Sequence, residues 1–70
     1  MARERYLQAI IDMVRSKGCV TRRHIVDQLA GTFNLTKRQA ERAAGEALES
    51  LVKRNIVVRK GRGVYCWPTI

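Results

Sequence analysis

The sequence predicts a small α+β domain that is mainly helical, with three helices followed by a C-terminal β-hairpin. Apolar residues recur at steps of three and four between residues 3 and 54, which is the period of amphipathic helices. After Asn55 the pattern changes to two runs rich in β-branched and aromatic residues, with glycines between them. Because the chain has only 70 residues, we expect residues 1–70 to form a single domain with a thin core.

The first predicted helix extends from Arg3 to Lys17 and ends before Gly18. Its last turn carries cations, which suit the negative end of the helix dipole. Glycine readily adopts the left-handed conformation that ends a helix. One face of this helix is apolar and should meet the core; it consists of Tyr6, Leu7, Ile10, Ile11 and Val14.

The second predicted helix follows a short extended segment, Cys19-Val20-Thr21. Thr21 is suited to cap it, because the threonine hydroxyl can accept a hydrogen bond from an unpaired N–H in the first turn. We expect the helix to end near Ala30-Gly31, since glycine often terminates helices. Its core face consists of Ile25, Val26 and Leu29.

The third predicted helix is the longest, from Lys37 to about Arg54, with Asn55 in the position after its end. The run Thr36-Lys37-Arg38-Gln39 matches a capping box, in which the threonine and glutamine side chains each satisfy a backbone N–H of the other residue. Phe33 and Leu35, in the connection before this helix, are expected to fill the core. The core face of the helix consists of Ala40, Ala44, Ala47, Leu48, Leu51 and Val52.

The predicted hairpin joins Ile56–Lys60 to Val64–Trp67 through Gly61-Arg62-Gly63. Pro68 should end the second strand, because proline has no N–H to donate to a ladder. Of the two aromatic residues in that strand, Tyr65 and Trp67, we expect one in the core and the other partly exposed.

The charge of the chain favours a polyanionic partner. Fourteen Lys and Arg residues against six Asp and Glu give a formal net charge of +8 and a pI near 10.6. A small domain with this surplus attracts nucleic acid through its electrostatic field. Charge alone leaves open a merely basic protein, or one that contacts a ribosome or a membrane surface.

Several other classes are excluded by the residues. No apolar stretch approaches the ~18 residues of a membrane span, and Asp12 and Arg15 interrupt any secretory signal. The sequence offers no carboxylate pair, metal-ligand cluster, phosphate loop or nucleophile–base arrangement, so we expect neither an enzyme, a small-molecule substrate nor a cofactor. His24 is expected to be exposed and not catalytic.

Two cysteines are too few for a disulfide scaffold or a zinc site. We therefore expect a cytoplasmic protein in which Cys19 and Cys66 are small buried apolar residues. If the segment around Val20 pairs with the second hairpin strand, the two thiols would lie near each other, and a redox role would remain open.

Three helices followed by a hairpin resemble the winged helix-turn-helix superfamily. The residues that carry the resemblance are the caps at Thr21 and Thr36, the break at Gly31, the pattern Ala44-x-x-Ala47-Leu48-x-x-Leu51 and the hairpin from Ile56 to Trp67. The resemblance implies that the third helix enters the DNA major groove and that the hairpin, or wing, follows the backbone or minor groove. It also implies a short third strand near Val20.

On the third helix, Arg38, Gln39 and Arg42 are the candidates for reading bases, since Arg can bridge guanine and Gln can bridge adenine. Thr36 and Lys37 lie at its N-terminus, where free N–H groups favour a phosphate. Gly45 would allow close approach on the same side. The alternative is a solvated face with Arg42–Glu46 and Glu49–Lys53 ion pairs, and Glu46 and Glu49 would repel phosphates.

Two further groups of cations are candidates for backbone contacts. Arg59, Lys60 and Arg62 surround the glycines of the hairpin tip, although charge there also protects an edge strand. Arg22 and Arg23 open the second helix, which crosses the backbone in this architecture; an ordinary solvated surface is the alternative.

These observations favour a sequence-specific duplex-DNA-binding transcriptional regulator, or a replication or recombination accessory factor. A homodimer on two half-sites is one option, because a single module offers a small interface. A different reading is a protein-interaction adaptor or inhibitor, of the kind that phages or plasmids encode, which Glu46 and Glu49 would suit. A third is RNA or ribosome binding by shape.

Overall fold

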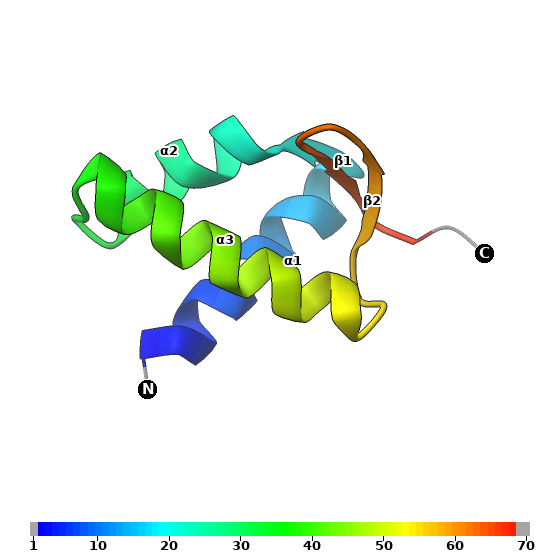
Figure 1. Cartoon of the computed structure of the whole chain (residues 1–70), viewed down its shortest axis with the longest axis horizontal. Helices are drawn as coiled ribbons and strands as arrows, with labels where there is room; N and C mark the ends of the chain where they lie inside the picture. The colour runs from blue at the N-terminus through cyan, green and yellow to red at the C-terminus, as the bar shows by residue number, and fades with distance from the viewer. Residues whose placement is uncertain (1, 69–70) are drawn as a thin grey trace.

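The computed structural model describes the backbone of residues 2–68 and the side chains of residues 4–68 (Figure 1). Its elements follow in the order α1 (Ala2–Lys17), β1 (Cys19–Thr21), α2 (Arg22–Thr32), α3 (Lys37–Lys53), β2 (Val58–Gly61) and β3 (Val64–Cys66). The predicted class is confirmed: the domain is mainly helical α+β, with three helices and a C-terminal hairpin. This topology is compatible with a winged helix.

The sheet is antiparallel, in the order β1-β3-β2. The segment around Val20 forms the third strand, as the resemblance implied. It pairs with β3 in a register that sets Cys19 opposite Cys66 and Val20 opposite Tyr65. The hydrogen bonding between β1 and β3 continues beyond the ends of these strands, because the backbone N–H of Arg22 donates to the carbonyl of Gly63 at 2.7 Å. The start of α2 is thereby fixed to the turn of the hairpin.

The helix ends are capped as the sequence predicts. Thr21 Oγ1 accepts from the N–H of His24 at 3.1 Å, and Thr36 and Gln39 form the complete capping box. Gly18 and Asn55 have positive φ values of 85° and 62°, the left-handed conformation that stops α1 and α3.

Several predicted boundaries differ from the structure by one or two residues, and β3 ends at Cys66 instead of Trp67. α2 continues through Gly31 to Thr32, because the left-handed residue that ends it is Asn34, with φ 55°, and the N–H of Leu35 returns to the carbonyl of Ala30 at 3.0 Å. β2 begins at Val58, since the N–H groups of residues 56 and 57 donate to the carbonyl of Leu51 and are not available to the ladder.

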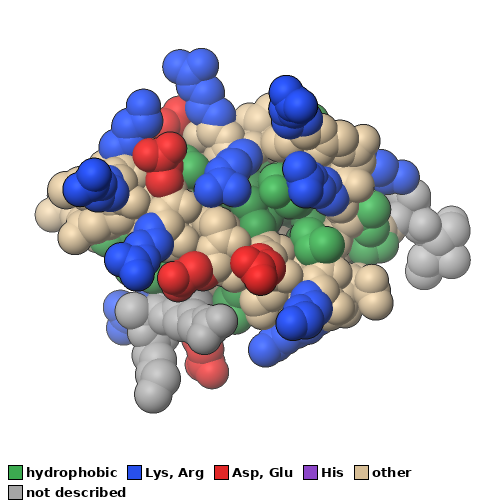
Figure 2. Space-filling model, in the orientation of Figure 1, with side chains coloured by type: hydrophobic (Ala, Val, Ile, Leu, Met, Phe, Trp, Pro, Cys, Tyr) green, Lys and Arg blue, Asp and Glu red, His purple; other side chains and the backbone are tan. Residues whose placement is uncertain are grey.

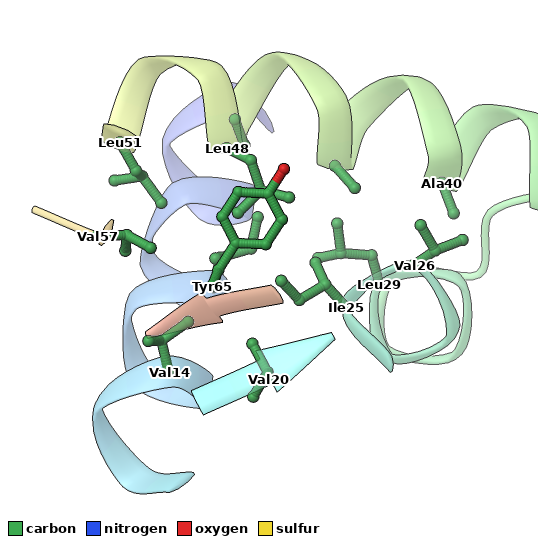
Figure 3. Packing of buried hydrophobic residues seen from close by; sticks show 13 residues of the cluster. Val14, Val20, Ile25, Val26, Leu29, Ala40, Leu48, Leu51, Val57 and Tyr65 are labelled. Atoms are coloured by element: carbon green, nitrogen blue, oxygen red, sulfur yellow. The ribbon is translucent and has the colours of Figure 1, made fainter. Parts of the chain in front are cut away.

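The core lies between the three helices and the sheet (Figure 3). The ring of Tyr65 extends from β3 toward Leu48 of α3, while Trp67 is half-buried, so one aromatic residue is in the core as expected. Phe33 and Leu35 are also only half-buried against this core. The largest fully buried side chains are Ile10, Ile25, Leu29, Leu48, Leu51, Val14 and Val57.

The two cysteines form a disulfide between β1 and β3, and the prediction of two unbonded apolar residues is wrong. The sulfur atoms are 2.09 Å apart, and the two cysteines are 47 positions apart in the chain. Cys19 is exposed, whereas Cys66 is buried. A disulfide sits uneasily with the expected reducing cytoplasm. Among the described residues, no helix has the length and apolar character needed to cross a membrane.

Candidate nucleic-acid interface

The predicted contact residues come from α2, α3 and the hairpin. α3 crosses one side of the molecule, with α2 along its upper edge and the hairpin beyond its C-terminal half (Figure 1). Figure 2 shows this side: Lys and Arg side chains are spread over it, acidic side chains lie among them, and an apolar area is open between them. The face is therefore predominantly basic but not uniformly so.

Arg38 and Arg42 lie one turn apart on α3, and both are exposed. The Nε of Arg42 is 3.7 Å from a carboxylate oxygen of Glu46, so the first of the two expected ion pairs is present. Their side chains are 84% and 62% exposed, and such a solvated pair is weak enough to yield to another partner. The second expected pair, Glu49 with Lys53, is not among the ion pairs of the described side chains.

Thr36 and Gln39 are held by the capping box. Gln39 Oε1 accepts from the N–H of Thr36 at 2.9 Å, and Thr36 Oγ1 accepts from the N–H of Gln39 at 3.1 Å. Reading adenine through both amide atoms of Gln39 would require the first of these bonds to break. Both side chains are exposed but already have a structural function.

The side chain of Arg22 occupies the space beside Gly45, where the sequence predicted the close approach of a ligand. A Cβ atom on Gly45 would lie 3.1 Å from Nη2 of Arg22. The same nitrogen lies 3.5 Å from the backbone carbonyl oxygen of Glu41. The space beside Gly45 is therefore filled by the guanidinium of α2's first residue.

Arg22 and Arg59 line one hollow of about 400 Å³ between α3 and the hairpin. Lys53 and Glu49 line it as well, and Leu48, Val52 and Tyr65 supply its apolar part. Three cations from three different elements thus surround a hollow that contains one carboxylate. Sequence reasoning placed Lys53 on the outward side of the helix but did not choose it as a contact residue; its position near Arg42 in helical projection was the available signal.

A neighbouring hollow lies between α2 and the N-terminal part of α3. Arg22, Arg23 and Lys37 line it, together with two carboxylates, those of Asp27 and Glu41. The structure therefore brings the predicted cations of α2 close to the N-terminus of α3. Arg22 belongs to both hollows and connects them.

The remaining candidates stand outside these two hollows. Arg38, Lys60 and Arg62 are exposed. Arg62 forms the hairpin turn with Gly63, whose φ of 70° meets the left-handed requirement of that turn. His24, expected to be exposed, is half-buried beside Cys19 and Val64 in a shallow hollow at the edge of the sheet.

Comparisons with protein-family models, curated proteins and solved structures found no match to this chain. The winged-helix-like description accordingly depends on the order of its elements and the register of its sheet.

Proposed function

We propose that the domain binds duplex DNA, with α3 in the major groove and the hairpin against the phosphate backbone. The observation that carries this proposal is the convergence of Arg22, Lys53 and Arg59, from α2, α3 and β2, around one hollow beside α3. Cations gathered from separate elements are not needed to keep a helix face solvated. They suit a ligand that carries several negative charges along a line.

The balance of charge on α2, α3 and the hairpin supports the same ligand. Nine cations lie there: Arg22, Arg23, Lys37, Arg38, Arg42, Lys53, Arg59, Lys60 and Arg62. Four carboxylates lie there with them: Asp27, Glu41, Glu46 and Glu49. The positive surplus outweighs the repulsion that Glu46 and Glu49 would exert on phosphates.

In this mechanism, phosphate contacts provide affinity and position, and side chains of α3 provide specificity. Arg38 and Arg42 are the residues for base contacts, because they are exposed one turn apart near the N-terminus of α3. The domain would act as a small sequence-specific regulator or as a replication or recombination accessory factor, without catalytic activity or cofactor. A homodimer on two half-sites would enlarge its small interface.

The first test is the affinity for labelled duplex DNA, measured by fluorescence anisotropy at increasing salt. We expect binding at about 50 mM salt and a log–log slope of roughly −0.9 for each phosphate neutralised. The double variant Arg38→Ala/Arg42→Ala should lose at least about 30-fold in affinity for a selected site, since two guanine contacts at about 1–3 kcal/mol each sum to about 2–6 kcal/mol.

Arg5→Ala is the matched control, because it removes an exposed arginine from α1 and should leave binding nearly unchanged. Selection from randomised duplexes tests specificity. Binding without any sequence preference would remove the regulator and leave an architectural role. Stronger binding to duplex RNA than to DNA would contradict the proposal.

A protein-interaction adaptor is the second candidate. It is favoured by Glu46 and Glu49 on α3 and by a partly apolar hollow between α1 and α3, lined in part by Tyr6, Leu35 and Ala43. An adaptor would fail to bind duplex DNA at low salt but would capture a defined protein. Glu46→Lys then discriminates, because it should weaken an adaptor and strengthen a DNA-binding domain.

We propose that the domain acts in the cytoplasm, where cellular reductants oppose disulfides. Alkylation of cellular protein before and after reduction, followed by mass measurement, reports whether the Cys19–Cys66 bond exists there. A fully reduced pair supports the cytoplasmic proposal, and a fully bonded pair supports an oxidising compartment.

A further inference from the structure

We propose that Arg22 and Arg59 together bind one DNA phosphate in the hollow between α3 and the hairpin, and that Gly45 is the residue that gives Arg22 access to it. This inference rests on the proposed DNA binding and extends it to one site and one determinant. It assigns to Gly45, which has no side chain, a role in recognition.

Arg22 is fixed at its backbone and directed across α3. Its N–H donates to the carbonyl of Gly63 at 2.7 Å, which ties it to the hairpin turn. Its side chain reaches α3, where Nη2 lies 3.5 Å from the carbonyl oxygen of Glu41. A guanidinium has five N–H donors, so this single long contact leaves most of them free.

The presence of glycine at position 45 is explained by the neighbouring Arg22 side chain. It is not explained by a backbone conformation that requires glycine. Positive φ values among the described glycines occur at Gly18 and Gly63, whereas Gly45 lies within α3 in ordinary helical conformation. Glycine is unfavourable inside a helix, so another reason is needed for its presence. The three nearest atoms that a Cβ there would meet all belong to the guanidinium of Arg22.

The surroundings of the hollow suit a phosphate. Arg59 and Lys53 line it beside Arg22, and Glu49 is the one carboxylate among its lining residues. Arginine presents paired donors that match two phosphate oxygens. Leu48, Val52 and Tyr65 form the apolar part of its wall, and the attraction between charges is stronger beside apolar groups than in bulk water.

The position of the hollow favours the backbone over the bases. Gly45 comes three positions after Arg42, which places it about 60° around the helix from Arg42, given 3.6 residues per turn. That flank faces the hairpin. When α3 lies in a groove, residues on its flank meet the wall of the groove, which is the phosphate backbone.

A double-mutant cycle tests this site with the whole chain and mixed-sequence duplex DNA. Arg22→Ala should weaken binding about tenfold, as expected for a lost charged hydrogen bond, and reduce the salt slope by about 0.9. Gly45→Leu should reproduce both changes by displacing the guanidinium. In the Arg22→Ala background, Gly45→Leu should have no further effect on affinity.

Gly45→Ala is a second variant for the case in which Gly45→Leu disturbs the fold. Its single added methyl already lies 3.1 Å from Nη2 of Arg22. We expect Gly45→Ala to raise the melting temperature, because alanine favours helix. It should lower DNA affinity less than Gly45→Leu does, because the end of the flexible Arg22 side chain has to shift by only a few tenths of an ångström. Arg5→Ala serves again as the charge-matched control.

Additive losses from Arg22→Ala and Gly45→Leu would overturn the inference, as would a salt slope in Arg22→Ala equal to that of Arg5→Ala. In either case wild-type binding would still support the proposed function. If the wild-type protein does not bind duplex DNA at all, the proposed function fails first and the phosphate site fails with it.

Discussion

The two halves of α3 acquire positive charge in different ways. The N-terminal half carries its own cations, Lys37, Arg38 and Arg42, directly in its sequence. The C-terminal half begins with Gly45 and Glu46 and includes Glu49. Its surroundings become basic because Arg22 of α2 and Arg59 of β2 line the hollow beside it together with its own Lys53.

This difference shows that the charge beside one part of a helix can come from neighbouring elements. Glu46 and Glu49 alone suggest that the C-terminal half cannot approach phosphates. The guanidinium of Arg22 lies against Gly45, between the turns that carry Glu41 and Glu49, and supplies the opposite charge there. The N-terminal half should therefore depend on local residues, and the C-terminal half on the attachment of α2 and the hairpin.

The largest effect should come from removing the disulfide, which supports the elements beside the C-terminal half of α3. The disulfide joins β1, which leads into Arg22, to β3, which pairs with Arg59 of β2. Removing a bridge across 47 residues should lower the free energy of unfolding by about 2–4 kcal/mol. Urea unfolding with and without dithiothreitol measures this change.

The variant Cys19→Ala/Cys66→Ala is the control, because its unfolding midpoint should not respond to the reductant. Its DNA affinity should equal that of the reduced wild-type protein. Identical unfolding midpoints for the wild type in the presence and absence of reductant would show that the disulfide does not stabilise the fold. It would then contribute nothing to the elements beside the C-terminal half of α3.

A smaller effect should come from neutralising either of two acidic residues in the C-terminal half of α3, Glu46 and Glu49. Glu49 lines the hollow with Arg22 and Arg59, whereas Glu46 pairs with Arg42 at 3.7 Å. Glu49→Gln should strengthen DNA binding by a few-fold, about 0.5–1 kcal/mol, by removing a like charge near the phosphate. Glu46→Gln should also release Arg42, but this exposed pair is weak, so the gain should be smaller. Anisotropy titrations at low and high salt compare the two variants, and a larger gain for Glu46→Gln would contradict the proposal that phosphate binds in the hollow lined by Glu49.

The sequence alone predicted the helical half of the fold well, because its signals are local. Thr21, Thr36 and Asn55 specify helix ends within a few residues of themselves, and each does so as expected. The end of α2 was missed because both Gly31 and Asn34 can adopt the left-handed conformation, and contacts of Leu35 decide between them.

The sheet and the basic hollow were predicted less completely, because they depend on contacts between distant segments. Cys19 and Cys66 bond because the register of β1 on β3 sets them opposite each other. The sequence predicted that Arg22 contacts the DNA backbone, because it lies at the start of α2. Its reach to Gly45 and its meeting with Arg59 depend on how α2 and the hairpin pack on α3.

The most direct test of DNA binding by this face is an NMR titration of the ¹⁵N-labelled protein with duplex DNA, followed at the glycine amides. Gly45, Gly61 and Gly63 lie on α3 and the hairpin, whereas Gly18 and Gly31 lie near the ends of α1 and α2. We predict shifts at the first three residues and nearly constant positions for Gly18 and Gly31. Shifts confined to Gly18 and Gly31, with Gly45 and Gly63 unmoved at saturation, would contradict the account.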